Sequence, residues 1–534
     1  MMNKKITAFV LAFLISVMTF SGLTSCKNDT AENSSQLSSE NTADVSGDGE
    51  GDGLEDTSSE EDGTGEDESA ITASNGQNST SANKTSSTGQ QTGQNTNVAS
   101  KPANVVTELP SHTYPNTPGE TSTKKLPDFI SELPASSTIT FLCSAEYGDD
   151  AKAMIEAFKT KTGKELKFKY DVVEWSKMQN ILATRVKSNN APDLFTYDGC
   201  VTPYLAAKSD EYFYKISDYI NMNDALWKDM QGISLLGFGK NNTQYAVATG
   251  APNVTQMVVY NKTLFEDAEL DDPMELYNQG KWTWDAFYEA TKELTVDKNH
   301  DGTPEVLGAS MPDYTFAMFC QSTGKDFATF NPDGTLTSNL KDPNFQRAAA
   351  MINKIGKISL DAESWNFTTR FSQNKIGMVI ANPWTTTSGA MNKMKKDGKI
   401  GFVPLPKDPQ SSKYYMQGSV NFSFIPKGAK NAKATAAWLY WQRYMDKNPN
   451  PAMQKKNLTD AKEKWGWTEA EYNLVYKDLQ KKVEFIIPYA DRVPDFDKQA
   501  YLWGMPFKES WTQTLNQVEP SFNKAINAFN KSLK

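Results

Sequence analysis

The sequence predicts an α/β fold of two lobes, preceded by a long segment without a core of its own. Short β-rich apolar runs alternate with helical segments from Ser137 onward, which is the pattern of an open parallel sheet. About 400 residues follow Ser136, more than one common core holds, so we expect two lobes. Residues 27–100 contain no Phe, Trp or Tyr, and we expect them to be disordered.

Residues 1–25 have the composition of a secretory signal peptide. Lys4 and Lys5 form a charged start, and residues 6–20 are an apolar run of 15 residues. A membrane-spanning helix needs roughly 20 apolar residues, so this run is too short to be one. The sequence therefore predicts export.

The run Leu23, Thr24, Ser25 and Cys26 resembles the lipobox of bacterial lipoproteins. The resemblance implies cleavage before Cys26 and lipidation of its thiol, for example by palmitate. Cys26 would then anchor the chain to the extracellular face of the cell membrane, as in Gram-positive bacteria. The alternative is an ordinary signal peptide followed by a Cys without this role.

We interpret residues 26–135 as an acidic linker rich in Ser, Thr and Gly. Residues 27–100 hold 15 acidic residues against Lys27 and Lys84, a net charge of −13. Without this stretch and the two lysines of the signal peptide, the chain's net charge of −10 becomes about +1. No basic patch stands out, so nucleic acid is not an expected partner. A flexible linker of about 100 residues spans roughly 50–60 Å and acts as a passive spacer.

Cysteine and histidine are scarce beyond the signal peptide. Cys143, Cys200 and Cys320 are too scattered for a zinc site or a disulfide framework. Pairing of Cys143 with Cys200 stays open beside their packing as small apolar residues. The two histidines, His112 and His300, lie in a linker and a turn, which leaves little material for a Ser-His-Asp or Cys-His site.

The first predicted elements alternate between strand and helix. Apolar residues recur at helical spacing over residues 149–161, and Gly163 follows as a typical helix-ending residue. In order, we expect a strand over 137–144, a helix over 149–161, a strand over 166–173, a helix over 176–187 and a strand over 192–199.

Ligands bind open parallel sheets beyond the carboxyl ends of their strands. This rule selects residues 144–147 after the first strand, Glu174 and Trp175 after the second, and Asp198 at the third.

The rest of the chain continues the mixed pattern. We expect a helix opening at 282–287, strands over 376–380, 400–406 and 417–425, a helix over 430–445, and a helical C-terminus interrupted near Pro488 and Pro494.

The ordered segments resemble the extracellular solute-binding family 1 proteins, the sugar-binding, maltose-binding-protein-like subunits of ABC importers. The matching segments are 144–147, 161–163, 191–195, 259–262, 282–287, 377–379, 403–406, 418–419 and the helix with Trp438. The resemblance implies two α/β lobes joined by a hinge, in a periplasmic-binding-protein-like fold.

The resemblance also implies domain boundaries. Residues 136–534 would form the solute-binding domain. Lobe 1 would comprise residues 136–255 and 418–450, and lobe 2 residues 256–417 and 451–534, since the chain crosses between lobes more than once.

Carbohydrate recognition uses flat aromatic faces together with carboxylates and amides. The strand ends supply Glu146, Tyr147, Glu174, Trp175 and Asp198. The resemblance adds Asn253, Tyr314, Trp384, Gln417, Gly418 and Trp503. The alternative for each aromatic residue is packing, and for each carboxylate a solvated loop. Trp282 and Trp284 match the family's scaffold, so we expect them to pack.

A candidate calcium loop begins at Asp297. Asp297, Asn299 and Asp301 resemble the first half of a calcium loop, with oxygen ligands at alternate positions. Gly308 stands where the bidentate Glu is expected, and Glu305 is a partial substitute. The alternative is an Asx-rich turn. We expect no other cofactor.

The resulting hypothesis is a lipid-anchored, monomeric protein that binds a sugar or oligosaccharide and delivers it to the permease subunits of an ABC importer by hinge closure. Two carboxylates that flank a sugar could instead hydrolyse it, but the resemblance implies binding without catalysis, and we predict no catalytic residue. The alternative function is a surface glycan-binding or sensor-coupled protein without a role in import.

Overall fold

The computed structural model of the chain describes residues 122–198, 203–237, 239–240, 243–312, 314–331, 334–359, 366–488, 493 and 505–533. The predicted signal peptide, lipidation site and linker up to residue 121 lie outside them, as do His112 and Cys200.

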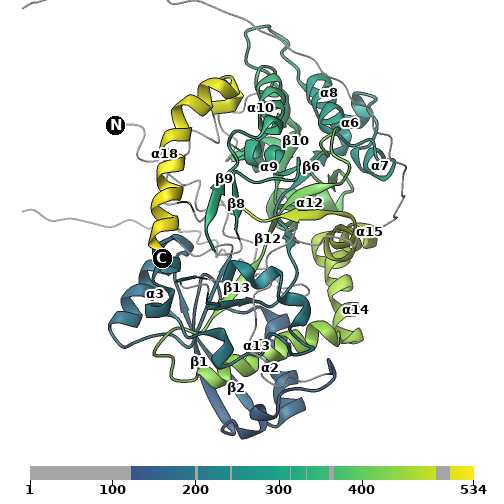
Figure 1. Cartoon of the computed structure of the whole chain (residues 1–534). Helices are drawn as coiled ribbons and strands as arrows, with labels where there is room; N and C mark the ends of the chain where they lie inside the picture. Colours follow the sequence, from purple (N-terminus) through teal and green to yellow (C-terminus); the bar gives the residue numbers. More distant parts are fainter. Residues whose placement is uncertain are drawn as a thin grey trace, which may run out of the picture. The chain divides into compact units, whose positions relative to one another are not determined.

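The first sheet has five strands in the order β2-β1-β3-β13-β4, and we call it and its helices lobe 1 (Figure 1). Its strands are β1 Ser136–Cys143, β2 Glu165–Val172, β3 Leu194–Asp198, β4 Ala246–Ala248 and β13 Asn421–Phe424. Strand β1 pairs in parallel with β2 and β3, which confirms the predicted parallel arrangement. Strand β13 is antiparallel to β3 and β4.

Helices cover both faces of the lobe 1 sheet because its strands alternate between two buried faces. Phe141 and Cys143 belong to one apolar cluster with α2 and α13, whereas Leu142 belongs to another with α3. The helices are α2 Asp149–Thr162, α3 Met178–Lys187, α4 Pro203–Ala207, α5 Ser209–Tyr212 and α13 Ala432–Lys447. Helix α2 ends as predicted at Gly163, whose φ of 69° lies in the left-handed region.

The second sheet has four strands in the order β11-β6-β10-β7, and we call it and its helices lobe 2. Its strands are β6 Met257–Asn261, β7 Leu307–Ser310, β10 Ile376–Ala381 and β11 Ile400–Val403. Its helices are α6 Lys262–Asp267, α7 Pro273–Asn278, α8 Trp284–Leu294, α9 Thr315–Gln321, α10 Pro343–Gly356, α11 Phe367–Ser372 and α12 Gly389–Lys396. All residues of β6 and β10 are buried.

A three-stranded sheet in the order β14-β12-β5 lies where the chain passes between the two lobes. Its strands are β5 Asn253–Val254, β12 Tyr415–Ser419 and β14 Glu484–Ile486. The prediction of one strand over 417–425 was wrong, because the chain leaves β12 at Val420 and enters β13 of the other sheet. Strands β8 Ala328–Phe330 and β9 Leu336–Ser338 form a separate pair.

The last part of the chain is helical, as predicted. Its helices are α14 Pro451–Asp460, α15 Glu469–Asn473, α16 Leu479–Lys482 and α18 Trp511–Ser532. Helix α18 is fixed to β9 because the Asn530 side chain accepts a hydrogen bond from the Leu336 N–H and donates one to its carbonyl, both at 2.8 Å.

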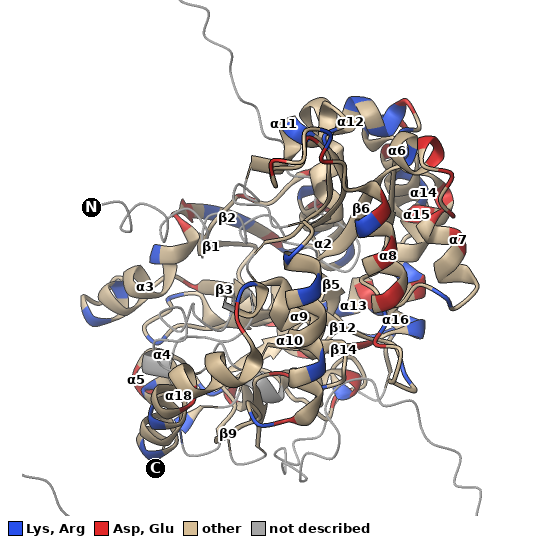
Figure 2. Ribbon diagram, turned by 90° about the horizontal axis from the view of Figure 1, so that it is seen from above, with Lys and Arg blue, Asp and Glu red and all other residues tan. Residues whose placement is uncertain are grey.

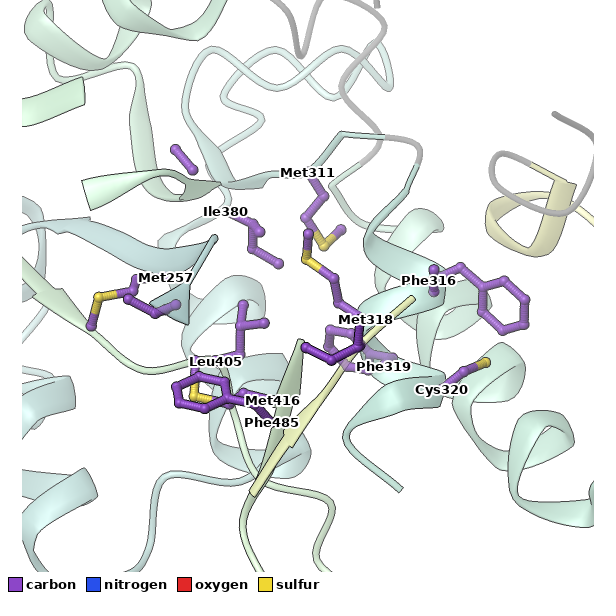
Figure 3. Packing of buried hydrophobic residues seen from close by; sticks show 14 of the residues in the cluster. Met257, Met311, Phe316, Met318, Phe319, Cys320, Ile380, Leu405, Met416 and Phe485 are labelled. Atoms are coloured by element: carbon purple, nitrogen blue, oxygen red, sulfur yellow. The ribbon is translucent and has the colours of Figure 1, made fainter. Parts of the chain in front are cut away.

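The lobe 2 core is rich in Met and Phe, and Figure 3 shows part of it, including Met311 and Met318. Met416 and Phe485, also drawn there, are register partners on β12 and β14. Cys143 and Cys320 are buried and free, which favours the packing interpretation for both. Charges of both signs are spread over the helices, with acidic residues on α7 and α8 and basic residues on α12 (Figure 2). Within the described residues, no helix combines the length and apolarity needed to cross a bilayer.

Candidate functional site

The carboxyl end of β10 presents a half-buried tryptophan, Trp384. Asn382 follows the strand and accepts a hydrogen bond from the Trp384 backbone N–H through Oδ1, at 2.9 Å. This cap begins the short helical turn Pro383–Thr387, with Pro at its first position, where a missing N–H costs nothing. The turn therefore fixes the backbone that carries Trp384.

Three aromatic side chains from a distant segment surround Trp384. The Trp467 ring stacks on it at 4.7 Å between centroids and 25° between planes. Trp465 meets it edge-on at 5.4 Å, and Tyr476 lies at 5.7 Å. Trp467 Nε1 donates to Thr386 Oγ1 at 2.9 Å, which ties the two segments together. These three residues were not among the predicted site residues, although the close spacing of Trp465 and Trp467 was a visible signal.

A change of helix type places Trp465 and Trp467. Helix α14 passes directly into the π-helical turn Ala461–Trp465, and Gly466 ends it at a φ of 72°. A Cβ at Gly466 would lie 2.8 Å from the Lys396 side chain, so this close approach also requires Gly. Trp467 follows at once. π-Helical turns are rare and often occur at functional sites.

A buried ion pair fixes α15 to α12. Lys395 Nζ lies 2.5 Å from Glu471 Oε1 and also donates to the Ile400 carbonyl at 3.0 Å. Burial lowers the pKa of Lys395, and Glu471 opposes that shift. Glu471 also accepts from the Thr468 N–H at 2.8 Å, as the far half of a capping box. The aromatic segment is thereby held against lobe 2.

Helix α14 also contacts lobe 1. Lys456 Nζ lies 3.3 Å from Asp150 Oδ1, in the first turn of α2, and 2.8 Å from Asp460. Burial raises the pKa of Tyr476 well above its usual value, and Tyr472 and then Asp150 add to the shift. The segment that surrounds Trp384 therefore also lies against the α2 end of lobe 1.

The lobe 1 strand ends contribute a second aromatic pair. Trp175, after β2, stacks on Tyr197 of β3 at 5.0 Å and 18°. Tyr197 precedes Asp198, which pairs in register with Asn421. The structure thus places Trp175 at the end of β3, next to the backbone of Asp198. The Asp198 side chain lies outside the described part of the chain.

The two predicted glutamates of lobe 1 are exposed. Glu174 forms an ion pair with Lys177 at 2.6 Å and accepts from Ser176 Oγ at 2.6 Å. Lys177 and then Ser176 lower its pKa. Glu146 and Glu174 therefore both lie at the surface, where a carboxyl group can accept hydrogen bonds from hydroxyl groups.

Tyr147 lies in the core of lobe 1 rather than at a surface that a ligand could reach. It is 4% exposed, and its hydroxyl accepts from Trp438 Nε1 at 3.0 Å. Its ring contacts Phe141 and Phe168. The chain turns after β1, so that Glu146 points outward and Tyr147 inward. The prediction of Tyr147 as a ligand contact was therefore wrong.

The crossover residues lie on the three-stranded sheet. Asn253 Oδ1 accepts from Gln480 Nε2 at 3.4 Å, and Gln417 Oε1 accepts from Thr255 Oγ1 at 3.2 Å. Gly418 is buried, and a Cβ there would lie 2.7 Å from Phe485. The structure gives Gly418 a packing role, and its predicted ligand contact stays a prediction.

Of the other aromatic residues that the sequence singled out, two tryptophans pack in the protein interior. Trp282 and Trp284 are each 2% exposed, and their indoles donate to the Pro404 carbonyl and to Ser322 Oγ, which confirms the expected packing. Tyr314 is half-buried beside the lobe 2 core, just before α9. Trp503 lies outside the described residues.

The candidate calcium loop has the hydrogen bonds of an Asx-rich turn. Asp297, Asp301 and Glu305 accept from the backbone N–H groups of Gly302, Thr303 and Lys298. Asn299 Oδ1 accepts from the Asp301 N–H at 3.0 Å. Over the described ranges, no three His, Cys, Asp or Glu side chains form a group that could hold a metal. Calcium binding stays a prediction.

Comparison with known proteins gives a family match over more than half of the chain. The sequence profile of the bacterial extracellular solute-binding proteins matches residues 144–443. The diacetylchitobiose-binding protein DasA of Streptomyces coelicolor is 25% identical over 264 residues. That alignment covers 48% of this chain and 57% of DasA, so the match spans little more than half of this relative.

Two solved structures share the fold along nearly their whole length. The substrate-binding protein Lmo0181 of Listeria monocytogenes, in complex with cycloalternan, has a TM-score of 0.52 at 17% identity, covering 73% of this chain and 99% of its own. The galacto-N-biose/lacto-N-biose I-binding protein of Bifidobacterium longum, in complex with lacto-N-biose, has a TM-score of 0.53 at 15% identity, covering 74% and 98%. These likenesses confirm the predicted two-lobed α/β fold.

Proposed function

The chain belongs to the family of bacterial extracellular solute-binding proteins, and from this premise we propose that it binds a carbohydrate and delivers it to an ABC importer. The family consists of binding proteins, so the proposal contains no catalytic step. Similarity to DasA, which is named for diacetylchitobiose, and to two sugar-bound structures supports a sugar as the solute.

One observation carries the carbohydrate assignment. Trp384 is half-buried at the end of β10, and Trp467 stacks on it. A sugar ring has an apolar C–H face that stacks on an indole and hydroxyl groups that need polar partners. On lobe 1, Trp175 and the exposed carboxylates of Glu146 and Glu174 offer both kinds of group.

The proposed mechanism is hinge closure around the strands that join the lobes. The sugar binds between the strand ends, and the lobes close about β5 and β12. Closure must be driven by contacts that exist only in the closed form. The closed protein then docks, as a monomer, on two membrane permease subunits.

A thermal-shift screen tests the carbohydrate assignment. The probes are diacetylchitobiose, cycloalternan, lacto-N-biose and a panel of other mono- and oligosaccharides, with amino acids as controls. We expect at least one sugar, and no amino acid, to raise the melting temperature in a concentration-dependent way. A panel in which amino acids shift the melting temperature and sugars do not would contradict the proposal.

We also propose that Cys26 carries the lipid anchor and that the acidic segment after it is the linker to the lobes. The end of the predicted linker is corrected, because Ile130 and Leu133 are buried in the lobe 1 core. The small residue before Cys26 and the short apolar run before it support this assignment. Expression in a Gram-positive host tests it: the wild type should fractionate with membranes, and Cys26→Ser should not. Equal fractionation of both would show that Cys26 has no anchoring role.

A further inference from the structure

At the end of the lobe 2 sheet, near Trp384, lie two polar atoms that have no hydrogen-bond partner in the part of the chain that the structure describes. Gln256 is 6% exposed, and its Oε1 has no hydrogen-bond partner among the described residues. Asn382 is half-buried, and its Nδ2 is a buried donor that likewise has none. A buried donor and a buried acceptor are both unpaired at this end of the sheet, which is unfavourable unless something else pairs with them.

The strand register places these two side chains together. Strands β6 and β10 are antiparallel, and their last pair at this end is Met257 with Ala381. Gln256 precedes Met257 and Asn382 follows Ala381, so they are the next opposed positions. Asn382 keeps an extended backbone, with φ −64° and ψ 132°. Because side chains alternate along a strand, Gln256 and Asn382 lie on the same face of the sheet.

The hydrogen bond from the Trp384 N–H shows which atom of the Asn382 amide has no partner among the described residues. Its Oδ1 already accepts from the Trp384 N–H at 2.9 Å, so the atom left over is the amide nitrogen, a donor. The same hydrogen bond holds the Asn382 side chain against the backbone that carries the Trp384 ring. Gln256 is also next to Thr255, which donates to Gln417 of β12. The pair therefore lies between the stacking surface and the hinge strands.

A hydroxyl group satisfies a donor and an acceptor at once, because it both accepts and donates hydrogen bonds. We propose that Gln256 and Asn382 form a subsite for one sugar hydroxyl, which accepts from Asn382 Nδ2 and donates to Gln256 Oε1 while the sugar ring lies against Trp384. This inference rests on the proposed carbohydrate function and assigns it a specificity-determining pair. A sugar that lacks this hydroxyl, or presents it in the other orientation, leaves both amides unpaired and is rejected.

Three variants test the subsite. Gln256→Met removes the acceptor at similar volume, and Asn382→Asp removes the donor but keeps an oxygen for the Trp384 N–H. Gln442→Met is the matched control. Gln442 is 5% exposed and its Oε1 has no partner within the described segments, but it lies on α13 of lobe 1. The probe is the sugar from the thermal-shift panel that stabilises the wild type most.

By titration calorimetry, we expect the first two variants to raise the Kd for this sugar about tenfold or more, and Gln442→Met to leave it unchanged. Without sugar, Gln256→Met should melt at or above the wild-type temperature, because it removes an unpaired buried group. A purely structural role would instead lower the melting temperature and the affinity together.

Monodeoxy derivatives of the same sugar identify the hydroxyl. One derivative should bind the wild type weakly and lose little further affinity in Gln256→Met. Wild-type affinity in both variants, or an equal loss for every derivative, would overturn the subsite and assign the two amides to a buried water. If these variants bind normally while Trp384→Ala does not, the proposed function stands without the subsite. A wild type that binds no sugar overturns both.

Discussion

Trp384 and Trp467 stack with their ring planes 25° apart, and Trp467 is the more deeply buried of the two, at 2% exposure. One face of Trp384 is therefore occupied by protein, and the ring is held in a fixed orientation before any ligand arrives. A pre-positioned ring loses less conformational freedom on binding than a mobile one, which favours affinity.

Replacing Trp384 by Ala should remove the stacking surface. We expect the Kd for the panel sugar to rise about 30-fold or more, as for a central aromatic contact. Tyr288→Ala is the control, since Tyr288 is a half-buried aromatic on α8 that contacts Lys354 instead. Titration calorimetry on both variants measures the Kd, and melting curves show whether the variants fold. Unchanged affinity in Trp384→Ala would remove this residue from the site.

Trp467 supports Trp384 through its ring and its indole N–H, and two variants separate these roles. Trp467→Phe keeps an aromatic ring but loses the bond to Thr386, at a cost of about 1 kcal/mol in stability. Trp467→Ala also leaves a cavity, at a cost of about 3–5 kcal/mol. Sugar affinity should fall more in Trp467→Ala than in Trp467→Phe. Equal affinities in a calorimetric titration would mean that Trp384 does not depend on its neighbour.

Replacing only one partner of the buried ion pair between Lys395 and Glu471 should destabilise the folded protein. Lys395→Met leaves a buried carboxylate without its partner, and we expect a loss of about 3–5 kcal/mol in the free energy of unfolding. The double variant Lys395→Met/Glu471→Gln should recover most of this loss, because Gln is neutral. Urea denaturation measures all three proteins. A double variant no more stable than Lys395→Met would show that the unpaired charge of Glu471 does not cause the loss.

Gly418 should not tolerate a larger side chain. Gly418→Ala brings a Cβ to 2.7 Å from Phe485, and we expect a destabilisation of about 1–3 kcal/mol. Gly232→Ala is the control, because no heavy atom lies within 4 Å of a Cβ there. Because Gly418 lies on a strand that joins the lobes, its variant should also bind sugar less tightly. Equal melting temperatures for the two variants would contradict the packing role.

Because the pKa of Glu165 is lowered in the folded protein, we predict that stability falls in acid. Lys159, Lys167 and Ser136 lower its pKa from an ordinary 4.5 to about 2, because they stabilise the charged form in the folded state. The contribution is therefore present above pH 4.5 and is lost as the pH falls towards 2. Melting temperatures should fall more steeply over this interval in the wild type than in Glu165→Gln. Parallel pH profiles would show that the carboxylate contributes nothing.

The alternation of strand and helix predicted lobe 1 well, because each buried strand and amphipathic helix there is complete in one short stretch of sequence. The break at Val420 was missed, since the apolar alternation runs through β12 and β13 without interruption. Only their partners in two different sheets distinguish them. A sequence pattern reports which residues are buried, not which sheet buries them.

The candidate site was predicted only in part, because a sequence pattern does not show which distant residues come together. Trp175 follows a strand closely, so the strand-end rule selects it, whereas Trp384 was implied by the family resemblance. Tyr147 also follows a strand, but the direction of the turn after β1 buries it. Trp467 reaches Trp384 from a distant helix, and no local signal connects the two. Gln256 and Asn382 come together through the register of two strands, which is a tertiary property.

The position of β13 has a consequence for how the protein is made. This strand pairs with both β3 and β4, so the central ladder of lobe 1 stays open until Phe424 has been synthesised. All four strands of the lobe 2 sheet emerge from the ribosome before that point. Closing such a long-range ladder is slow. Export by the predicted signal peptide would thus begin while lobe 1 is still unfinished, before its sheet can close.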